Sequence, residues 1–503
     1  MAIGSWLTER GCGIFLHVSS LSGGCGIGCF GQSAHNFIKF LISSGMKYWQ
    51  VCPLNPTGYG DSPYQSPSAF AGNPYFIDLQ ELVGEKFLTN GDLNVLMAMS
   101  ESFVNFGELY KNFWPILKIA FDNFSYSGKH IEAFDHFCQQ SAWWLDNYAT
   151  FMALKDHFDG RRWMDWPREF FDPSVAATKL RSNEKLRRTA TFYKFTQWIF
   201  DRQWNRLKNF ANDNGIKIIG DIPIFVGLDS ADVWANKRIF KLNKDGSPKF
   251  VAGVPPDAFS KTGQLWGNPV YDWDILVADD FTWWTNRIKR CVELYDVVRL
   301  DHFRGFCDYW EIPAPASTGM GGKWEKSVGI KFFQHVKKAF PNIKLIAEDL
   351  GCLNDDVMQL LQDTGLPGMK VLQFAFDGNN KNKYLPHEHE KNSVLYLGTH
   401  DNDTTAGWFR SLPEDIKHQV RCYMRTSCDD GAWDFIKKAY ESPSNLLILS
   451  MQDILNLGSE ARFNTPNVPF GNWQWRMTAN QFNGLCESPT PQYLRHLQDI
   501  YGR

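Results

Sequence analysis

Eight short apolar runs, separated by segments with helical periodicity, constrain the fold of this 503-residue chain most strongly. Each run is rich in apolar or β-branched residues and is bounded by turn residues, which is typical of a buried strand. The runs lie at residues 13–20, 47–54, 217–226, 296–303, 344–350, 369–377, 393–400 and 445–451. Eightfold strand–helix alternation predicts an α/β protein built as a (β/α)8, or TIM, barrel. A doubly wound open sheet is the second possibility.

Two intervals between runs are too long for ordinary barrel loops, and both predict insertions into a single catalytic domain spanning residues 1–503. Residues 55–215 contain long stretches with helical periodicity and predict a mostly helical subdomain after the second strand. Residues 227–290 are rich in Gly, Pro, Trp and Asp and would carry a flap after the third strand. Both insertions leave the carboxyl ends of their strands, so both would wall an active site there.

Composition and charge indicate a soluble cytoplasmic protein. The net charge of −3 and the isoelectric point near 6.5 give no reason to expect nucleic acid or an anionic membrane as a partner. No apolar run approaches the roughly 20 residues that span a bilayer. The 11 cysteines are scattered without a repeated spacing, which favours reduced thiols over a disulfide framework. A zinc site from Cys25, Cys29, His17 and His35 has no second CxxC pair to support it.

Three of the runs stop at carboxylates. Asp301 ends the run in VVRLDHFRG, Glu348 ends that in LIAEDLG, and Asp401 follows that in LGTHDND. The carboxyl ends of the strands of a parallel barrel face one side, where they form the active site. We therefore expect the three acids to converge. Two or three convergent carboxylates, without a nucleophilic serine signature, favour glycosidic-bond chemistry.

The neighbours of these acids indicate different roles for them. Arg299 lies two residues before Asp301, on the same strand face, and would keep that carboxyl ionised. Glu348 follows apolar residues in an acid-crowded pocket, where a raised pKa would make it a proton donor. His400 and Asp401 suit hydrogen bonds to vicinal hydroxyl groups.

A metal site is the rival reading of the same residues. His302, Glu348, His400 and Asp401 could ligate a metal ion, but none of the usual HxH or HExxH spacings occurs. Neutral carbohydrate requires no metal, so we predict neither a metal nor a cofactor.

Two loop segments carry further candidate residues. The segment 55–79, rich in Gly, Pro and Ser, would form a rigid loop after the second strand. It would present Tyr59, Asp61, Ser62, Tyr64 and Gln65. In the segment 253–273, paired prolines would stiffen the flap. Its candidate residues are Asp257, Gln264 and Trp266.

Eight longer motifs follow one another along the chain. They are NPTGYGDSPYQSPSAFAGNP, GDIPIFVGLDSADVW, GVPPDAFSKTGQLWGNPVYDW, RLDHFRGF, IAEDLG, GLPGMKVLQFAFD, GTHDNDT and GNWQWR. Together they resemble the signatures of the amylomaltases, the 4-α-glucanotransferases or disproportionating enzymes of glycoside hydrolase family 77. The resemblance extends from the first run to about residue 477, essentially the whole chain.

The resemblance implies a (β/α)8 barrel and a retaining double displacement on maltooligosaccharides and α-1,4-glucans, in glycogen or maltodextrin metabolism. Carried over by motif, Asp301 would be the nucleophile and Glu348 the general acid/base. Asp401 would hold the donor sugar in its distorted, oxocarbenium-like state. Retention requires the two reacting carboxyl groups to lie about 5 Å apart.

The resemblance also implies a set of substrate-binding residues. Asp221, Arg299 and His400 would line the donor subsite. Contacts to glucose units on either side of the cleavage point would come from Tyr64, Asp257, Gln264 and Trp266. Tyr59, Asp61, Ser62 and Asp377 complete the predicted set.

The chain departs from the family pattern in two loops. Cys29 in GIGCFG stands where the family usually has an acid. Pro466-Asn467-Val468 replaces a family-like PGT. Neither departure touches the three carboxylates, but both bear on loop conformation and acceptor preference.

Two other functions stay open at this point. One is an α-1,4-glucan hydrolase that uses the same carboxylates, because the acids alone do not distinguish water from sugar as acceptor. The other is a non-catalytic glucan-binding protein on the same scaffold. A metal-dependent barrel enzyme ranks below both.

Overall fold

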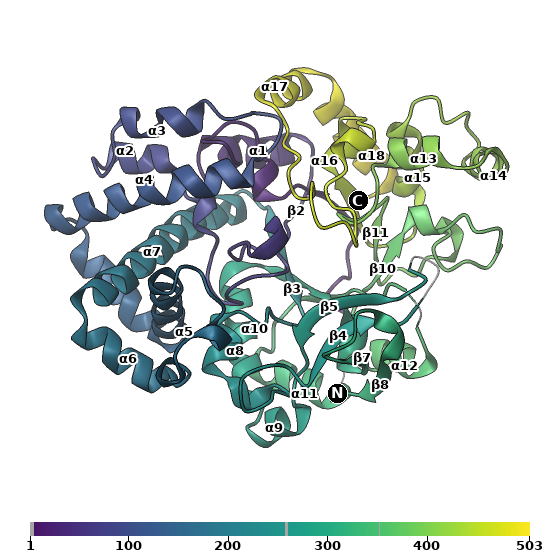
Figure 1. Cartoon of the computed structure of the whole chain (residues 1–503). Coiled ribbons are helices and arrows are strands. Elements are labelled where there is room, and N and C mark those ends of the chain that lie inside the picture. The colour runs from purple at the N-terminus through teal and green to yellow at the C-terminus, as the bar shows by residue number, and fades with distance from the viewer. Residues whose placement is uncertain (1–4, 257–259, 352) are drawn as a thin grey trace.

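All eight predicted strands occur in the computed structural model, which describes residues 5–256, 260–351 and 353–503. They close into one barrel of parallel strands in which neighbours in space are neighbours along the chain (Figure 1). The strands are β1 (Gly11–Phe15), β2 (Tyr48–Gln50), β3 (Lys217–Pro223), β6 (Val297–Asp301), β9 (Leu345–Ala347), β10 (Gly368–Val371), β11 (Ser393–Tyr396) and β12 (Leu446–Ser450). β12 pairs with β1 and completes the ring. The (β/α)8 prediction is confirmed, and the open doubly wound sheet is excluded.

Several strands are shorter than the apolar runs that predicted them. β1 gives way to a 3-10 turn at Val18–Ser20, and β10 to another at Leu372–Phe374. After β11, the side chain of Asn402 accepts hydrogen bonds from both the backbone N–H and the hydroxyl of Thr399. Such local bonds replace the strand ladder, so the chain turns although its residues stay apolar or small. Asp401 therefore lies in the loop after β11.

The helices surround the barrel and its insertions. They are α1 (Gln32–Ser43), α2 (Leu79–Gly84), α3 (Asn90–Met97), α4 (Phe106–Ser127), α5 (Ile131–His157), α6 (Pro173–Ser182), α7 (Glu184–Asp213), α8 (Ala231–Ala235), α9 (Trp273–Ala278), α10 (Thr282–Leu294), α11 (Ile330–Ala339), α12 (Asp355–Thr364), α13 (Thr405–Ser411), α14 (Glu414–Met424), α15 (Ala432–Glu441), α16 (Met451–Ile454), α17 (Ala479–Glu487) and α18 (Thr490–Tyr501). Between β10 and β11, the fully described segment 372–392 contains two 3-10 turns and no α-helix.

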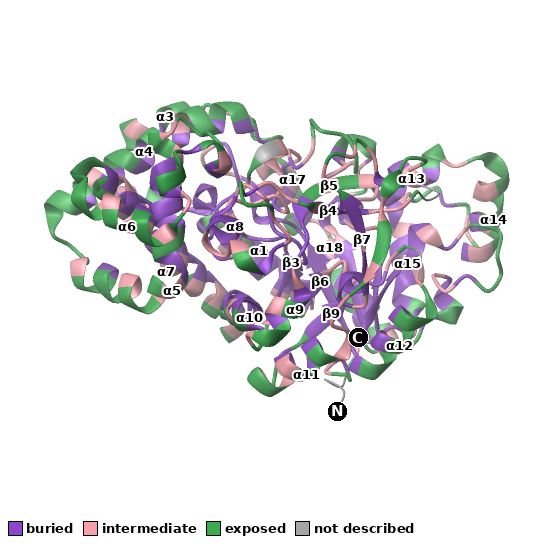
Figure 2. Ribbon diagram, turned by 60° about the horizontal axis from the view of Figure 1, so that its bottom comes forward, coloured by how far each residue is buried: buried purple, intermediate pink, exposed green. Residues whose placement is uncertain are grey.

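Residues 55–215 contain α2 to α7, which lie to one side of the barrel (Figure 1). The 30-residue α7 is the spine of this region, and α5 packs along it. Its buried side chains recur at spacings of three and four, as an amphipathic helix requires. They include Leu186, Ala190, Tyr193, Gln197, Phe200, Trp204, Leu207 and Ala211. Figure 2 shows that the outer faces of α3, α4 and α6 are exposed by contrast.

An antiparallel sheet, not predicted from the sequence, stands beside the carboxyl end of the barrel. Its strand order is β5 (Gln264–Pro269), β4 (Phe250–Val254), β7 (Asp308–Pro313) and β8 (Lys323–Lys326). The first two strands come from residues 227–290, and the other two come from the loop after β6. The flap insertion is therefore braced by the loop that follows Asp301.

The barrel interior is apolar along most of its length and polar near the carboxyl ends of the strands. β12 is buried over its first four residues, and β1 over all five. Near the carboxyl ends of the strands, Tyr396 donates a hydrogen bond to Gln50 at 2.9 Å. At Gly220, a Cβ would come within 2.2 Å of the Tyr295 ring, so only glycine lets β3 approach this closely. The position of the next residue, Asp221, depends on that contact.

Across the described parts of the chain, no helix combines the length and the apolar character needed to cross a membrane. The ten cysteines whose placement is described are all free thiols.

Candidate active site

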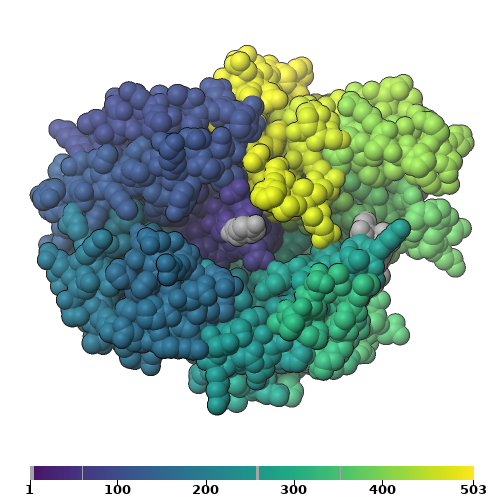
Figure 3. Space-filling model, viewed as in Figure 1, coloured from purple at the N-terminus to yellow at the C-terminus, as the bar shows by residue number. Residues whose placement is uncertain are grey.

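A cavity of about 430 Å³ opens at the carboxyl ends of the barrel strands. Figure 3 shows this face hollowed between the helical insertion, the antiparallel sheet and the C-terminal segment. Nine predicted site residues line the cavity: Ser62, Tyr64, Gln264, Trp266, Arg299, Asp301, Glu348, His400 and Asp401. Residues separated by more than 300 positions in the sequence therefore share one cavity, as the barrel topology predicts.

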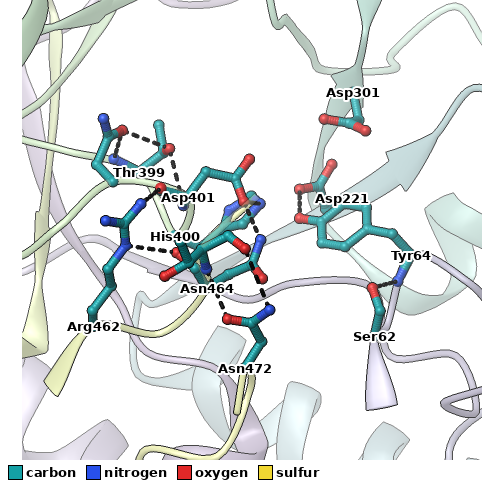
Figure 4. A network of polar contacts seen from close by, with 12 residues as sticks. Ser62, Tyr64, Asp221, Asp301, Thr399, His400, Asp401, Arg462, Asn464 and Asn472 are labelled. Carbon is teal, nitrogen blue, oxygen red and sulfur yellow. Dashed lines mark hydrogen bonds and ion pairs between the residues drawn. The ribbon is translucent and has the colours of Figure 1, made fainter. Parts of the chain in front are cut away.

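Arg299 organises one wall of the cavity. Its guanidinium lies 2.6 Å from Asp221 Oδ2 and 2.9 Å from Asp301 Oδ1. Asp221 also accepts a hydrogen bond from the Tyr64 hydroxyl at 2.8 Å (Figure 4). Burial opposes the charge of Arg299, but Asp221 and Asp301 raise the pKa of this group well above its ordinary value. The arrangement balances the negative charge of Asp301, whose side chain is 28% exposed and open to the cavity.

Glu348 is held in a different way. Its carboxylate accepts backbone N–H bonds from His302 at 2.7 Å and from Leu350 at 2.8 Å. The pKa of Glu348 is raised to about 8, chiefly by burial, with Arg299 lowering it and the nearby charge of Asp301 raising it. Glu348 is therefore mostly protonated at neutral pH and can donate a proton to a group in the cavity.

His302 adopts a strained backbone conformation where Asp301 and Glu348 meet. Its φ of 56° lies in the left-handed region, which is uncommon for residues other than glycine. This turn directs its N–H toward the Glu348 carboxylate. Strain of this kind persists only where the surrounding structure enforces it and is frequent at active sites.

Asp401 lies on the opposite side of the cavity, in the loop after β11. It accepts a hydrogen bond from the Asn464 side chain at 2.6 Å and lies 3.5 Å from His400 Nε2 (Figure 4). Arg462 donates to its backbone carbonyl at 2.7 Å. With 46% of its side chain exposed, Asp401 keeps a carboxylate oxygen available to a ligand.

Aromatic side chains frame the space between these acids. The Tyr64 ring stacks on His400 with centroids 5.1 Å apart, and Trp473 packs against both rings. Trp266 meets the His302 ring edge-on at 4.9 Å and donates from Nε1 to Gln264 at 3.0 Å. Flat aromatic faces beside carboxyl groups suit a sugar ring, which has both apolar and polar faces.

Three predicted residues whose side chains are described do not line this cavity. Asp221 lies behind the wall, where it reaches the cavity through Tyr64 and Arg299. Asp61 lies in the 3-10 turn Tyr59–Asp61, just before Ser62, and burial raises its pKa. Asp377 is exposed, and its carboxylate accepts the backbone N–H of Asn379.

The remaining two predicted residues are Tyr59 and Asp257. Tyr59 belongs to the same 3-10 turn. Asp257 falls outside the described residues.

Some lining residues were not predicted as substrate-binding. His302, Asn464, Asn467 and Trp473 all face the cavity. Burial lowers the pKa of His302 to about 4, so its imidazole is neutral, and Nε2 has no hydrogen-bond partner within the described chain. The GNWQWR motif contains Trp473, but its position in the sequence gave no indication that it faces the site.

Besides the hydrogen bond from His302 to Glu348, a second set of side-chain contacts links the loops that carry Asp301 and Glu348. Arg304, two residues after His302, bonds Asp308 at 2.7 Å and lies 3.5 Å from the ring centre of Trp324. Asp308 in turn accepts a hydrogen bond at 2.8 Å from Asn354, which caps α12. The antiparallel sheet thus helps to fix the relative position of the two loops.

The described residues contain no group of three or more His, Cys, Asp or Glu side chains arranged to hold a metal ion. A larger groove, of about 1,040 Å³, adjoins the cavity and shares Gln65 and Trp266 with it. Side chains from α4, α5 and α7 line that groove.

Comparison with known proteins places this geometry in context. A family model described as 4-alpha-glucanotransferase matches residues 16–481. The chain is 44% identical to a 4-alpha-glucanotransferase of Clostridium butyricum, over 97% of this chain and 100% of the relative. It is 45% identical to that of Thermus thermophilus, over 94% and 96%. The solved structure of an amylomaltase from Streptococcus agalactiae, in complex with acarbose, superposes with a TM-score of 0.94 at 38% identity and covers 98% of this chain and 100% of its own.

Proposed function

The chain belongs to the 4-alpha-glucanotransferase family and is an enzyme of this type, and from that premise we propose how its own residues carry out the transfer. The proposed reaction moves α-1,4-glucan segments between maltooligosaccharides by a retaining double displacement. The observation that carries it is the pairing, in one cavity, of an arginine-bound carboxylate with a carboxyl whose pKa is raised to about 8. Family membership favours transfer over plain hydrolysis and over glucan binding without catalysis.

In the first step, the carboxylate of Asp301 attacks the anomeric carbon of the donor. The bond from that carbon to the glycosidic oxygen breaks, and protonated Glu348 gives its proton to the departing oxygen. Arg299 balances the charge of Asp301 before attack without blocking its free oxygen. The product of this step is a glycosyl ester of Asp301 and a free glucan with a new 4-hydroxyl group.

In the second step, Glu348 is ionised and acts as a base. It takes the proton of an acceptor 4-hydroxyl group while that oxygen attacks the anomeric carbon, and the ester bond to Asp301 breaks. Asp401, with His400 beside it, would bind hydroxyl groups of the donor sugar and favour its distorted state. Two inversions at one carbon leave the product with the configuration of the donor.

Sugar binding would come from the aromatic and polar frame of the cavity. Tyr64 and Trp266 would contact sugar faces, while Gln264 and Ser62 would bind hydroxyl groups. Tyr59, Asp61, Asp257 and Asp377 would contact glucose units of a chain that extends past the cavity. The adjoining groove is large enough to receive such an extension. We place the enzyme in the cytoplasm, in glycogen or maltodextrin metabolism, where its substrates occur and its thiols stay reduced.

The decisive experiment incubates the purified protein with maltotriose, without metal or nucleotide, and follows product lengths together with total reducing ends. Transfer gives glucose and a ladder of longer maltodextrins at a constant number of reducing ends. Rising reducing ends without longer products would show hydrolysis. An unchanged substrate would leave only a binding role for the cavity.

A further inference from the structure

The loop that links Phe463 to Trp473 forms one edge of the active-site cavity and is held in a fixed shape. At its base, Trp473 donates a backbone hydrogen bond to Phe463 at 2.7 Å. Within it, the Asn472 side chain accepts from Thr465 N–H at 2.8 Å and donates to the Val468 carbonyl at 2.7 Å. We call residues 464–472 the rim loop. Because its own side chains satisfy its backbone, its shape does not depend on a bound ligand.

The tip of the rim loop is a tight turn with an asparagine at its most demanding position. Val468 N–H bonds the Thr465 carbonyl at 3.2 Å, which closes a four-residue turn. Pro466 is the second residue, and Asn467, with φ of 64°, is the third. Proline followed by a residue of positive φ is the pattern of a type II turn, in which glycine suits the third position best. Asparagine tolerates this positive φ, but it does not stabilise the turn more than glycine would.

Asn467 lines the same cavity as Asp301, Glu348 and Asp401. Two other asparagines of the rim loop use their amides within the protein. Asn464 binds Asp401, and Asn472 clamps the loop. The Asn467 amide, by contrast, makes no hydrogen bond or ion pair with any described residue. A polar group on a rigid loop, open to a ligand cavity and without an internal partner, is available to the ligand.

We propose that Asn467 is a specificity-determining residue that binds hydroxyl groups of a glucose unit in the cavity. This inference rests on the proposed function, because it takes the ligand to be an α-glucan. A carboxamide offers both a donor and an acceptor, which matches two neighbouring hydroxyl groups of a pyranose ring. The residue does not take part in the chemical step, since proton transfer and attack belong to Glu348 and Asp301. Its effect falls on the affinity for short substrates, which have few other contacts.

The test uses Asn467→Gly, which removes the amide and suits the positive φ of the turn. Val468→Thr is the matched control, because Val468 is the next residue, is 47% exposed and does not line the cavity. For Asn467→Gly we expect the KM for maltotriose to rise about three- to tenfold, with kcat within about twofold and an unchanged or higher unfolding temperature. The effect is smaller with maltoheptaose. The control keeps the KM of the unsubstituted protein.

A binding measurement separates this inference from the proposed function. In an Asp301→Asn background, which cannot turn over, calorimetric titration with maltotriose should show a Kd that Asn467→Gly raises about three- to tenfold and Val468→Thr leaves unchanged. Equal Kd and KM values with and without the amide would overturn the inference while transfer by the unsubstituted protein stands. Absence of transfer by the unsubstituted protein would overturn the proposed function, and the Kd comparison would still decide the role of Asn467.

Discussion

The floor and the rim of the cavity are built on opposite principles. The floor consists of side chains at strand ends, with Arg299 and Asp221 less than 5% exposed and bonded to one another. The rim consists of strand β5 of the antiparallel sheet and a loop from the C-terminal part of the chain, which present Trp266 and Asn467 to solvent and cavity together. Buried ionic groups lose much free energy when a partner is removed, whereas exposed loop residues lose little.

This difference teaches where catalysis and selectivity reside. The floor fixes which carboxyl is charged and which holds a proton, so its alteration should change kcat. In the proposed function the rim would contact sugar and exclude water, so its alteration should change KM and the share of hydrolysis. The comparison would fail if a rim substitution abolished the chemical step, or if a floor substitution changed only affinity.

The largest expected effect comes from the two reacting carboxyls. Asp301→Asn and Glu348→Gln should lower the transfer rate from maltotriose, by about 10⁴-fold or more and by about 10²- to 10⁴-fold respectively. With α-maltosyl fluoride as donor, Glu348→Gln should regain much of the rate of the first step, because fluoride leaves without a full proton. Asp301→Asn should not regain it. Fluoride release measures this step directly.

Two outcomes would contradict the assignment. Fluoride release by Asp301→Asn at the rate of the unsubstituted protein would exclude Asp301 as nucleophile. An equal loss for Glu348→Gln with both donors would mean that Glu348 does not protonate the leaving group. Asp122→Asn on α4 is a suitable control, because this half-exposed aspartate pairs with Arg188 and lines neither the cavity nor the adjoining groove.

The next largest effect is the dependence on pH. The pKa of Glu348 is raised to about 8 by burial first, and its protonated form is the one that donates. As pH rises through about 8, Glu348 loses its proton, and kcat/KM for maltotriose should fall about tenfold for each further pH unit. The fall should be much weaker with α-maltosyl fluoride. A flat maltotriose profile up to pH 9.5, with the protein still folded, would contradict the proton-donor role.

The smallest effect is expected at the rim. Trp266→Leu removes an aromatic ring that packs edge-on against His302. The same ring lines both the cavity and the adjoining groove. Because aromatic contacts contribute about 0.5–1.5 kcal/mol, KM for maltotriose should rise up to about tenfold. Reducing ends should also accumulate faster relative to longer products, since water enters more readily. A loss of kcat as large as that of Glu348→Gln would erase the distinction between rim and floor.

The barrel and the carboxylates could be predicted because each depends on local sequence. A buried parallel strand reads as an apolar run, and Asp301 and Glu348 follow such runs directly. The sequence predicts Asp401 at a strand end, but the strand stops at Tyr396, and Asp401 lies in a turn closed by the hydrogen bond from Thr399 to Asn402. Asp401 nevertheless lines the cavity.

What the sequence did not reveal depends on pairing between distant segments. The antiparallel sheet pairs β4 and β5 with β7 and β8, although the barrel strand β6 lies between the two pairs in the sequence. Neither pair on its own shows a strong alternation of apolar and polar residues. Asn464 lies 63 residues after Asp401 in the chain and donates a side-chain hydrogen bond to it. No motif or spacing in the sequence predicts this bond. The link from Asp308 to Asn354 is of the same kind.

The charged groups that line the cavity also determine which sugars can enter. Among the described lining residues, Asp301 and Asp401 supply carboxylates and Glu348 supplies a mostly protonated carboxyl, whereas the guanidinium of Arg299 is already shared with Asp221 behind the wall. A phosphate ester brings between one and two negative charges near neutral pH, and clefts lined by one sign of charge repel ligands of the same sign. Phosphorylated sugars should therefore be excluded by electrostatic repulsion, although their rings would fit. The acids proposed to cleave and re-form neutral glucans would thereby also keep the enzyme free of inhibition by phosphorylated sugars.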